Sequence, residues 1–115
     1  MKSKYLPREQ LLPAPRITPS HGNIVKYSEV TGGNGRIVIP SYPGIAVGHT
    51  IAWSVRGNGT AFSWFEVETL APSYEADLKF DIVFVDTDSV VASFYVWHND
   101  EVLGYSEEKE YTVVK

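Results

Sequence analysis

Short runs of strand character, each closed by a turn signal, follow one another from residue 23 to the end of the chain. In residues 78–85, for example, large apolar side chains recur at every second position, a period typical of a strand with one face in a core and the other in water. No segment sustains the spacing of an amphipathic helix, and the one helical candidate, Pro72 to Leu78, is long enough for only about two turns. Strands are therefore predicted at residues 24–27, 36–40, 50–56, 61–70, 78–85, 90–98 and 111–114.

About seven strands within fewer than one hundred residues is the count and spacing of an immunoglobulin-like sandwich. The fold predicted for residues 23–115 is accordingly all-β, an antiparallel seven-stranded immunoglobulin-like β-sandwich. Asn58–Gly59 predicts a hairpin between two of these strands. The 115 residues suffice for one domain.

Prolines mark two places where the sequence does not favour strand pairing. Residues 1–22 hold four of the seven prolines, so this stretch is predicted to be a proline-rich extended tail or linker. Pro40 and Pro43 flank a second break, because proline cannot donate to a ladder. Here we expect the chain to cross between the sheets, with Ile45 and Val47 placed between them.

Charge and composition argue against several classes of function. The chain has no cysteine, which excludes disulfides, cysteine nucleophiles and thiolate zinc sites. Its net charge is −4, and the first sixteen residues contribute four basic and one acidic side chain (+3), so the remainder totals −7. Such an acidic body repels nucleic acid. With no apolar run long enough for a signal peptide or a bilayer span, we expect a soluble chain, no membrane insertion and no signal peptide.

Two longer segments resemble a known family. "IPSYPGIAVGHTIAWSVRG" (Ile39 to Gly57) and "FYVWHNDEVLGYSEEKEYTV" (Phe94 to Val113) are similar to the turn-and-strand pattern of bacterial immunoglobulin-like repeats of large surface and adhesin-type proteins. "LLPAPRITPSHG" resembles the proline-rich joint that precedes such repeats. His49 stands where the family usually has aspartate. The resemblance implies a non-catalytic spacer or adhesive module, extracellular or at the cell surface if exported.

The aromatic residues near residue 97 supply the candidate ligand site. One face of the predicted strand 90–98 carries the apolar Val90, Ala92, Phe94 and Val96, which places Trp97 on the opposite, outer face. An exposed tryptophan can stack on a sugar ring or anchor a protein interface. Trp97, His98, Asn99 and Asp100 are therefore predicted to bind a glycan or protein ligand. The alternative is cross-strand pairing of Trp97 with Tyr105 or Tyr111.

The other tryptophans and the polar clusters lead to fewer predictions. Trp53 is predicted to be a core residue, and the position of Trp64 stays open. Asp86, Asp88 and Asp100 offer oxygens suitable for calcium, but an ordinary aspartate turn explains the first two equally well. No metal site and no cofactor are predicted.

No serine or histidine lies in a nucleophile motif, so the chain is not expected to be an enzyme. The predicted function is a non-catalytic module for adhesion, spacing or protein–protein interaction. The alternatives are a free-standing carbohydrate-binding domain and a small acidic immunity or regulatory protein.

Overall fold

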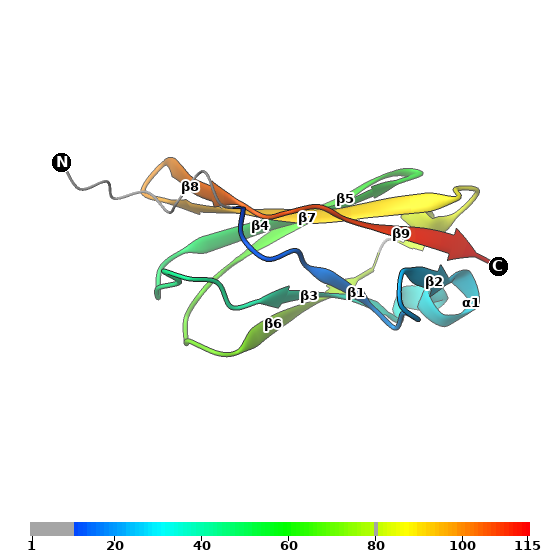
Figure 1. Cartoon of the computed structure of the whole chain (residues 1–115), viewed down its shortest axis with the longest axis horizontal. Coiled ribbons are helices and arrows are strands. Elements are labelled where there is room, and N and C mark those ends of the chain that lie inside the picture. Colours follow the sequence, from blue (N-terminus) through cyan, green and yellow to red (C-terminus); the bar gives the residue numbers. More distant parts are fainter. Residues whose placement is uncertain (1–10, 80) are drawn as a thin grey trace.

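The computed structural model describes residues 11–79 and 81–115 and arranges them as two layers of strands (Figure 1). The elements in chain order are β1 (Arg16–Thr18), β2 (Ile24–Lys26), α1 (Tyr27–Val30), η1 (Thr31–Gly33), β3 (Gly35–Pro40), β4 (Thr50–Gly57), β5 (Gly59–Glu66), β6 (Ser73–Leu78), η2 (Asp81–Phe84), β7 (Ser89–His98), β8 (Glu101–Tyr105) and β9 (Lys109–Val114).

One layer is a three-stranded sheet of order β1-β3-β6, and the other is a six-stranded sheet of order β2-β9-β7-β4-β5, in which β8 also pairs with β7. The prediction of an all-β chain with two sheets is confirmed. The described residues form nine strands rather than seven, because the first and last predicted strands are each accompanied by a further short one. Most pairs are antiparallel, but β2 runs parallel to β9.

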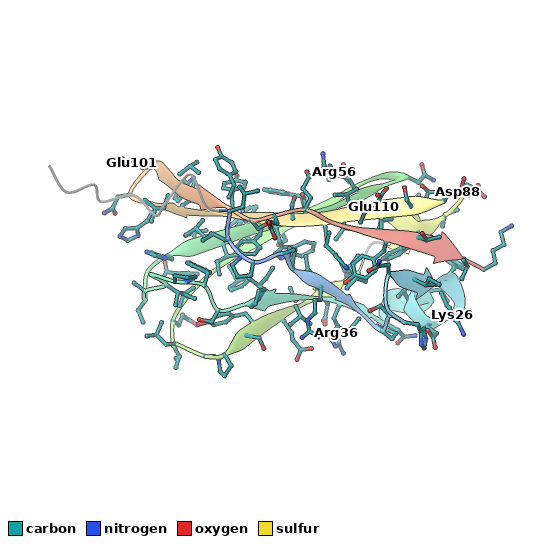
Figure 2. All side chains as sticks on the ribbon, in the orientation of Figure 1. Lys26, Arg36, Arg56, Asp88, Glu101 and Glu110 are labelled. Atoms are coloured by element: carbon teal, nitrogen blue, oxygen red, sulfur yellow. The ribbon has the colours of Figure 1, made fainter. Side chains whose placement is uncertain are left out.

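The core lies between the two layers, where alternate side chains of facing strands meet. On β7 the residues at positions 90, 92, 94 and 96 are buried, and on β4 Ile51, Trp53 and Val55 are buried, so the predicted faces of both strands are confirmed. Figure 2 shows side chains filling the space between the layers, while the labelled Arg56 and Arg36 point away from it on opposite sides. The described helices include none that could span a bilayer.

The proline-rich break after β3 carries the chain from the three-stranded to the six-stranded sheet, as the sequence predicts. The side chain that enters the core there is Tyr42, which is 3% exposed and packs 6.1 Å from the ring of Phe94. Ile45 is partly buried against the core. The expectation for Val47 is wrong, since its side chain is largely exposed.

The structure corrects the prediction for residues 72–85. The helical candidate is the strand β6, which pairs with β3 along its whole length. The second half of the predicted strand 78–85 is the 3₁₀ turn η2, where consecutive Val83 and Phe84 are buried and Ile82 is exposed. The reason is topological: the chain must leave one sheet and enter the other between β6 and β7. Phe80, which the alternation placed in the core, lies outside the described residues.

Part of the predicted proline-rich lead-in packs against the sandwich. Leu12 and Ile17 are buried in the core, and β1 pairs with β3. The backbone N–H of Ile17 also donates a hydrogen bond to the Tyr111 hydroxyl (3.1 Å), which joins the two layers. Proline spacing alone misses these contacts, because prolines at 13, 15 and 19 leave residues 16–18 free to pair.

Candidate functional site

A row of aromatic side chains lies on the outer face of the six-stranded sheet. Phe62 and Trp64 project from β5, and Tyr95 and Trp97 project from β7. Between them runs β4, whose outward residues are the small Thr50, Ala52 and Ser54. These seven residues form what we call the aromatic groove: two aromatic walls over a floor of small side chains.

The strand register creates this arrangement. Ala52 of β4 lies opposite Trp64 on one side and Tyr95 on the other. Ser54 similarly lies between Phe62 and Ser93. Because neighbouring strands are spaced about 4.8 Å apart, the backbones that support the two walls are roughly 10 Å apart. The wall from β5 and the wall from β7 are far apart in sequence. The β4–β5 hairpin and the pairing of β4 with β7 bring them together.

The groove is open and unusually apolar for a surface. Trp64 is 65% exposed, Phe62 50% and Trp97 39%. The space lined by the groove residues other than Ser54 measures about 360 Å³. An adjoining hollow of about 250 Å³ continues it toward Tyr105, Ser93 and Glu108. A larger hollow of about 720 Å³ lies at the other end of the molecule, between the start of α1, residues 84–88 and the end of β9.

Polar groups border the aromatic walls without adding net charge. The Ser54 and Ser93 hydroxyls lie 3.4 Å apart on the floor of the adjoining hollow. Glu108 at its rim forms an ion pair with Arg56. Tyr95 and Tyr105 pack with ring centroids 6.1 Å apart. The surface thus combines flat apolar rings with hydroxyl groups and one neutralised carboxylate, a mixture that suits an uncharged ligand with both C–H faces and hydroxyls.

Of the four predicted site residues, only Trp97 belongs to the aromatic groove. Cross-strand aromatic pairing with Tyr105 does occur on this face, but the partner is Tyr95 and not Trp97. Tyr111 is buried, and Trp97 lies opposite Val102 after a register shift.

His98 turns to the inner side of β7, where its Nδ1 lies 3.0 Å from the carbonyl oxygen of Gly48. Asn99 and Asp100 form the two-residue turn between β7 and β8. Their φ angles are 51° and 63°, as a hairpin turn with two left-handed positions requires. The sequence HNDE therefore has a structural role in this turn, and its side chains do not extend the groove.

Sequence reasoning missed Phe62 and Trp64 as site residues. The predicted strand 61–70 contains both. Alternation places them on the same face as the polar Thr60 and Glu66, which indicates an outward face. It does not reveal that Trp64 faces Tyr95 across Ala52, because alternation defines a face but not a register.

The carboxylates considered for calcium are not brought together. Asp86 and Asp88 precede β7, whereas Asp100 follows it. A ten-residue strand separates the two turns, a distance of roughly 30 Å at 3.3 Å per residue. Thr87 Oγ1 donates a hydrogen bond to the carbonyl oxygen of Ser89 in the first turn, so that turn is held locally.

A buried polar cluster lies just beneath the Trp97 end of the groove. His49 is 7% exposed, and its Nδ1 lies 2.9 Å from the Tyr42 hydroxyl. The rings of His49 and His98 are 5.7 Å apart. Burial, with a smaller contribution from His98, lowers the pKa of His49, while burial chiefly raises the pKa of Tyr42. A neutral His49 and a protonated Tyr42 hydroxyl therefore share this hydrogen bond.

This cluster predicts that acid weakens the fold. Because the pKa of His49 is lowered from its ordinary value of 6.5, the unfolded chain binds this proton more readily than the folded protein. The contribution of His49 to stability is then complete above pH 6.5 and is lost as the pH falls toward the lowered pKa. We expect the melting temperature to fall more steeply from about pH 7.5 to about pH 5.5 in the native protein than in His49→Gln. Glutamine keeps an acceptor for Tyr42 but does not titrate, so parallel pH curves would contradict the assignment.

Comparison with known proteins gave no match of this chain to a protein-family model, to a curated protein or to a solved structure.

Proposed function

We propose that the chain is a non-catalytic binding module that holds an uncharged oligosaccharide in the aromatic groove. The observation that supports this most is the pair of facing aromatic walls, Phe62 and Trp64 against Tyr95 and Trp97, left open on a sheet face. A contiguous exposed apolar patch on a protein surface marks a ligand-binding groove or an interaction site. A pyranose ring offers a flat C–H face for stacking and hydroxyls around its rim.

The groove fits a chain of sugars better than a compact small molecule. It is long and shallow, because the space beside Trp64 and Trp97 continues into the hollow beside Tyr105. The hydroxyls of Thr50, Ser54 and Ser93 line this path and provide hydrogen-bonding partners between the stacking rings. The Arg56–Glu108 pair at the far end is neutralised, which favours a neutral ligand over a phosphorylated or acidic one.

An immunoglobulin-like arrangement remains our interpretation of the two sheets. The order β1-β3-β6 in one sheet and β9-β7-β4-β5 in the other supports it, since immunoglobulin variable-type sandwiches extend one sheet by an additional strand in this way. Together with the resemblance to bacterial surface repeats, this favours a module that places its groove on a larger assembly, with adhesion as the use of the binding.

The proposal of no catalysis is supported by what the three histidines contact. His21 pairs with Glu29 on the surface, His49 bonds to Tyr42 in the interior, and His98 lies against a backbone carbonyl. Each histidine therefore has a partner consistent with a structural role.

The test is a titration of the protein with a panel of uncharged oligosaccharides, followed by tryptophan fluorescence and calorimetry. We expect at least one sugar to change the emission, and Trp64→Ala and Trp97→Ala each to weaken its binding at least about tenfold, the equivalent of about 1.4 kcal/mol. Losing a stacking ring removes both its apolar contact and its geometric preference.

Ile82→Ala provides the matched control, because Ile82 is a large exposed apolar residue on η2 rather than on the groove. It should leave sugar affinity unchanged. If no sugar in the panel binds, or if both tryptophan variants bind as tightly as the native protein, the glycan proposal is wrong.

A further inference from the structure

The free edges of the two sheets differ in how they are protected from pairing with another chain. β1 and β2 have three residues each, β8 has five, and β6 has six with Glu75 and Asp77 among them. Short length and charge are usual protections of an edge strand. β5 has eight residues, Gly59 to Glu66, with neither proline nor lysine and with a charge only at its last position.

β5 also holds two of the most exposed aromatic residues of the chain. Phe62 and Trp64 pack against each other with ring centroids 6.0 Å apart, yet both remain at least half exposed. β5 is the last strand in the order of its sheet and pairs with β4 on one side. Within the described parts of the chain, no strand pairs with its other side. A long edge of this kind, with little charge and no proline, is a template for a further strand.

We propose that this strand is β5 of a second copy, paired antiparallel about a two-fold axis at Ser63. The axis must pass through a residue and not between two residues, because otherwise outward side chains of one copy would stand opposite inward side chains of the other. An axis at Ser63 pairs residues 60–66 of both copies, and an axis at Phe62 would give an overlap of equal length, residues 59–65. The axis at Ser63 is favoured because it sets Phe62 opposite Trp64, whereas an axis at Phe62 would set Trp64 opposite Thr60. This inference goes beyond the proposed function and does not depend on it.

The register at Ser63 is self-complementary. Phe62 of each copy lies opposite Trp64 of the other, so four aromatic rings meet on the outer face, and aromatic cross-strand pairs are favourable. On the inner face Ala61 lies opposite Phe65. At the ends Glu66 lies opposite Thr60, so the single charge of each strand never meets its own equivalent.

Charge does not oppose a second copy in this register. The one charged residue of β5, Glu66, lies opposite the neutral Thr60 of the other copy. On β6, by contrast, self-pairing would bring Glu75 and Asp77 of two copies together, and like charges on opposite strands repel. The observations therefore single out β5 among the edges.

Pairing through β5 changes the aromatic groove as well. The wall made by Phe62 and Trp64 becomes a shared central ridge, with a groove of one copy on each side of it. The newly covered surface consists mainly of two aromatic side chains and one strand edge per copy. That is small beside an ordinary interface of about 1,600 Å², so a weak dimer is expected.

Cysteine cross-linking tests the register, because the native chain has no cysteine of its own. At high protein concentration, a short thiol cross-linker should join Ser63→Cys to itself. Thr60→Cys alone and Glu66→Cys alone should not be cross-linked. In this register Thr60 lies opposite Glu66, so the two copies of either residue are six positions apart along the strands, or roughly 20 Å. A mixture of these two variants should cross-link to each other. Leu70→Cys, exposed and outside β5, gives the background level.

Sedimentation of the native protein without any sugar tests the dimer itself. We expect the weight-average mass to rise from one chain toward two between about 10 µM and 1 mM. A mass of one chain over the whole range, or cross-linking of Ser63→Cys and of the mixture no greater than for Leu70→Cys, would overturn the proposal. Neither measurement involves ligand, so failure of the glycan titration leaves this result unaffected.

Discussion

Replacing Ile17 by alanine is expected to lower the free energy of unfolding by about 3 kcal/mol. Ile17 is fully buried in the core, and truncating a buried isoleucine removes apolar contacts and leaves a cavity. The result is informative because Ile17 lies in the stretch that proline content assigns to a tail. A residue in a tail would contribute nothing to the stability of the sandwich.

Urea unfolding followed by tryptophan fluorescence measures the change, with Arg16→Ala as the matched control. Arg16 is the neighbouring residue of β1, and its side chain is exposed, so its removal should change the free energy of unfolding by no more than about 0.5 kcal/mol. Equal stability of the Ile17→Ala and Arg16→Ala proteins would show that β1 does not hold the core together.

Replacing Gly57 by alanine should cost about 3 kcal/mol, at the upper end for the insertion of one methyl group into a packed site. A β-carbon at position 57 would lie 2.3 Å from the carbonyl oxygen of Val83 and 2.6 Å from Cγ1 of Val90. The carbonyl belongs to the main chain of η2, which also accepts a hydrogen bond from the N–H of Asn58 (3.0 Å). It therefore cannot move without disturbing the contact between the β4–β5 hairpin and η2.

Gly33→Ala is the control that separates this collision from backbone conformation. Gly33 has a φ of +79° and open space where its β-carbon would be, so alanine there should cost only about 1 kcal/mol, the penalty of the left-handed region. Thermal melts of both variants measure the difference. If Gly57→Ala is no less stable than Gly33→Ala, η2 yields easily and the packing described for the hairpin is wrong.

The alternating residues made the core predictable. Phe94 and Trp53 are buried as the period of their strands indicates, because a strand with one face in the interior must place every second residue there. Residues 78–85 also alternate, yet Val83 and Phe84 are both buried in η2. There the requirement to change sheets outweighed the local preference, and nothing within eight residues of sequence specifies where the next strand must begin.

The candidate site was predictable only in part. Trp97 could be placed on an outer face from its own strand, but a groove needs a second wall, and that wall comes from Trp64. Their relation depends on β4 pairing with both β5 and β7 through Ala52, a register set by the hairpin and by the core. His98 was predicted to share the site of Trp97 because the two are adjacent in sequence. Adjacent residues of a strand point to opposite faces, so His98 points inward and lies beside His49.

The parallel pair of β2 and β9 has a consequence for a chain under load. β2 runs in the same direction as β9 until close to the C-terminus. A force that separates Ile24, at the start of β2, from Lys115 pulls these two strands along their own length, so that the evenly spaced bonds between them share the tension and must rupture together. Loaded in this shear geometry, the sandwich would resist stretching more strongly than a hairpin pulled from its open end, whose hydrogen bonds break one at a time.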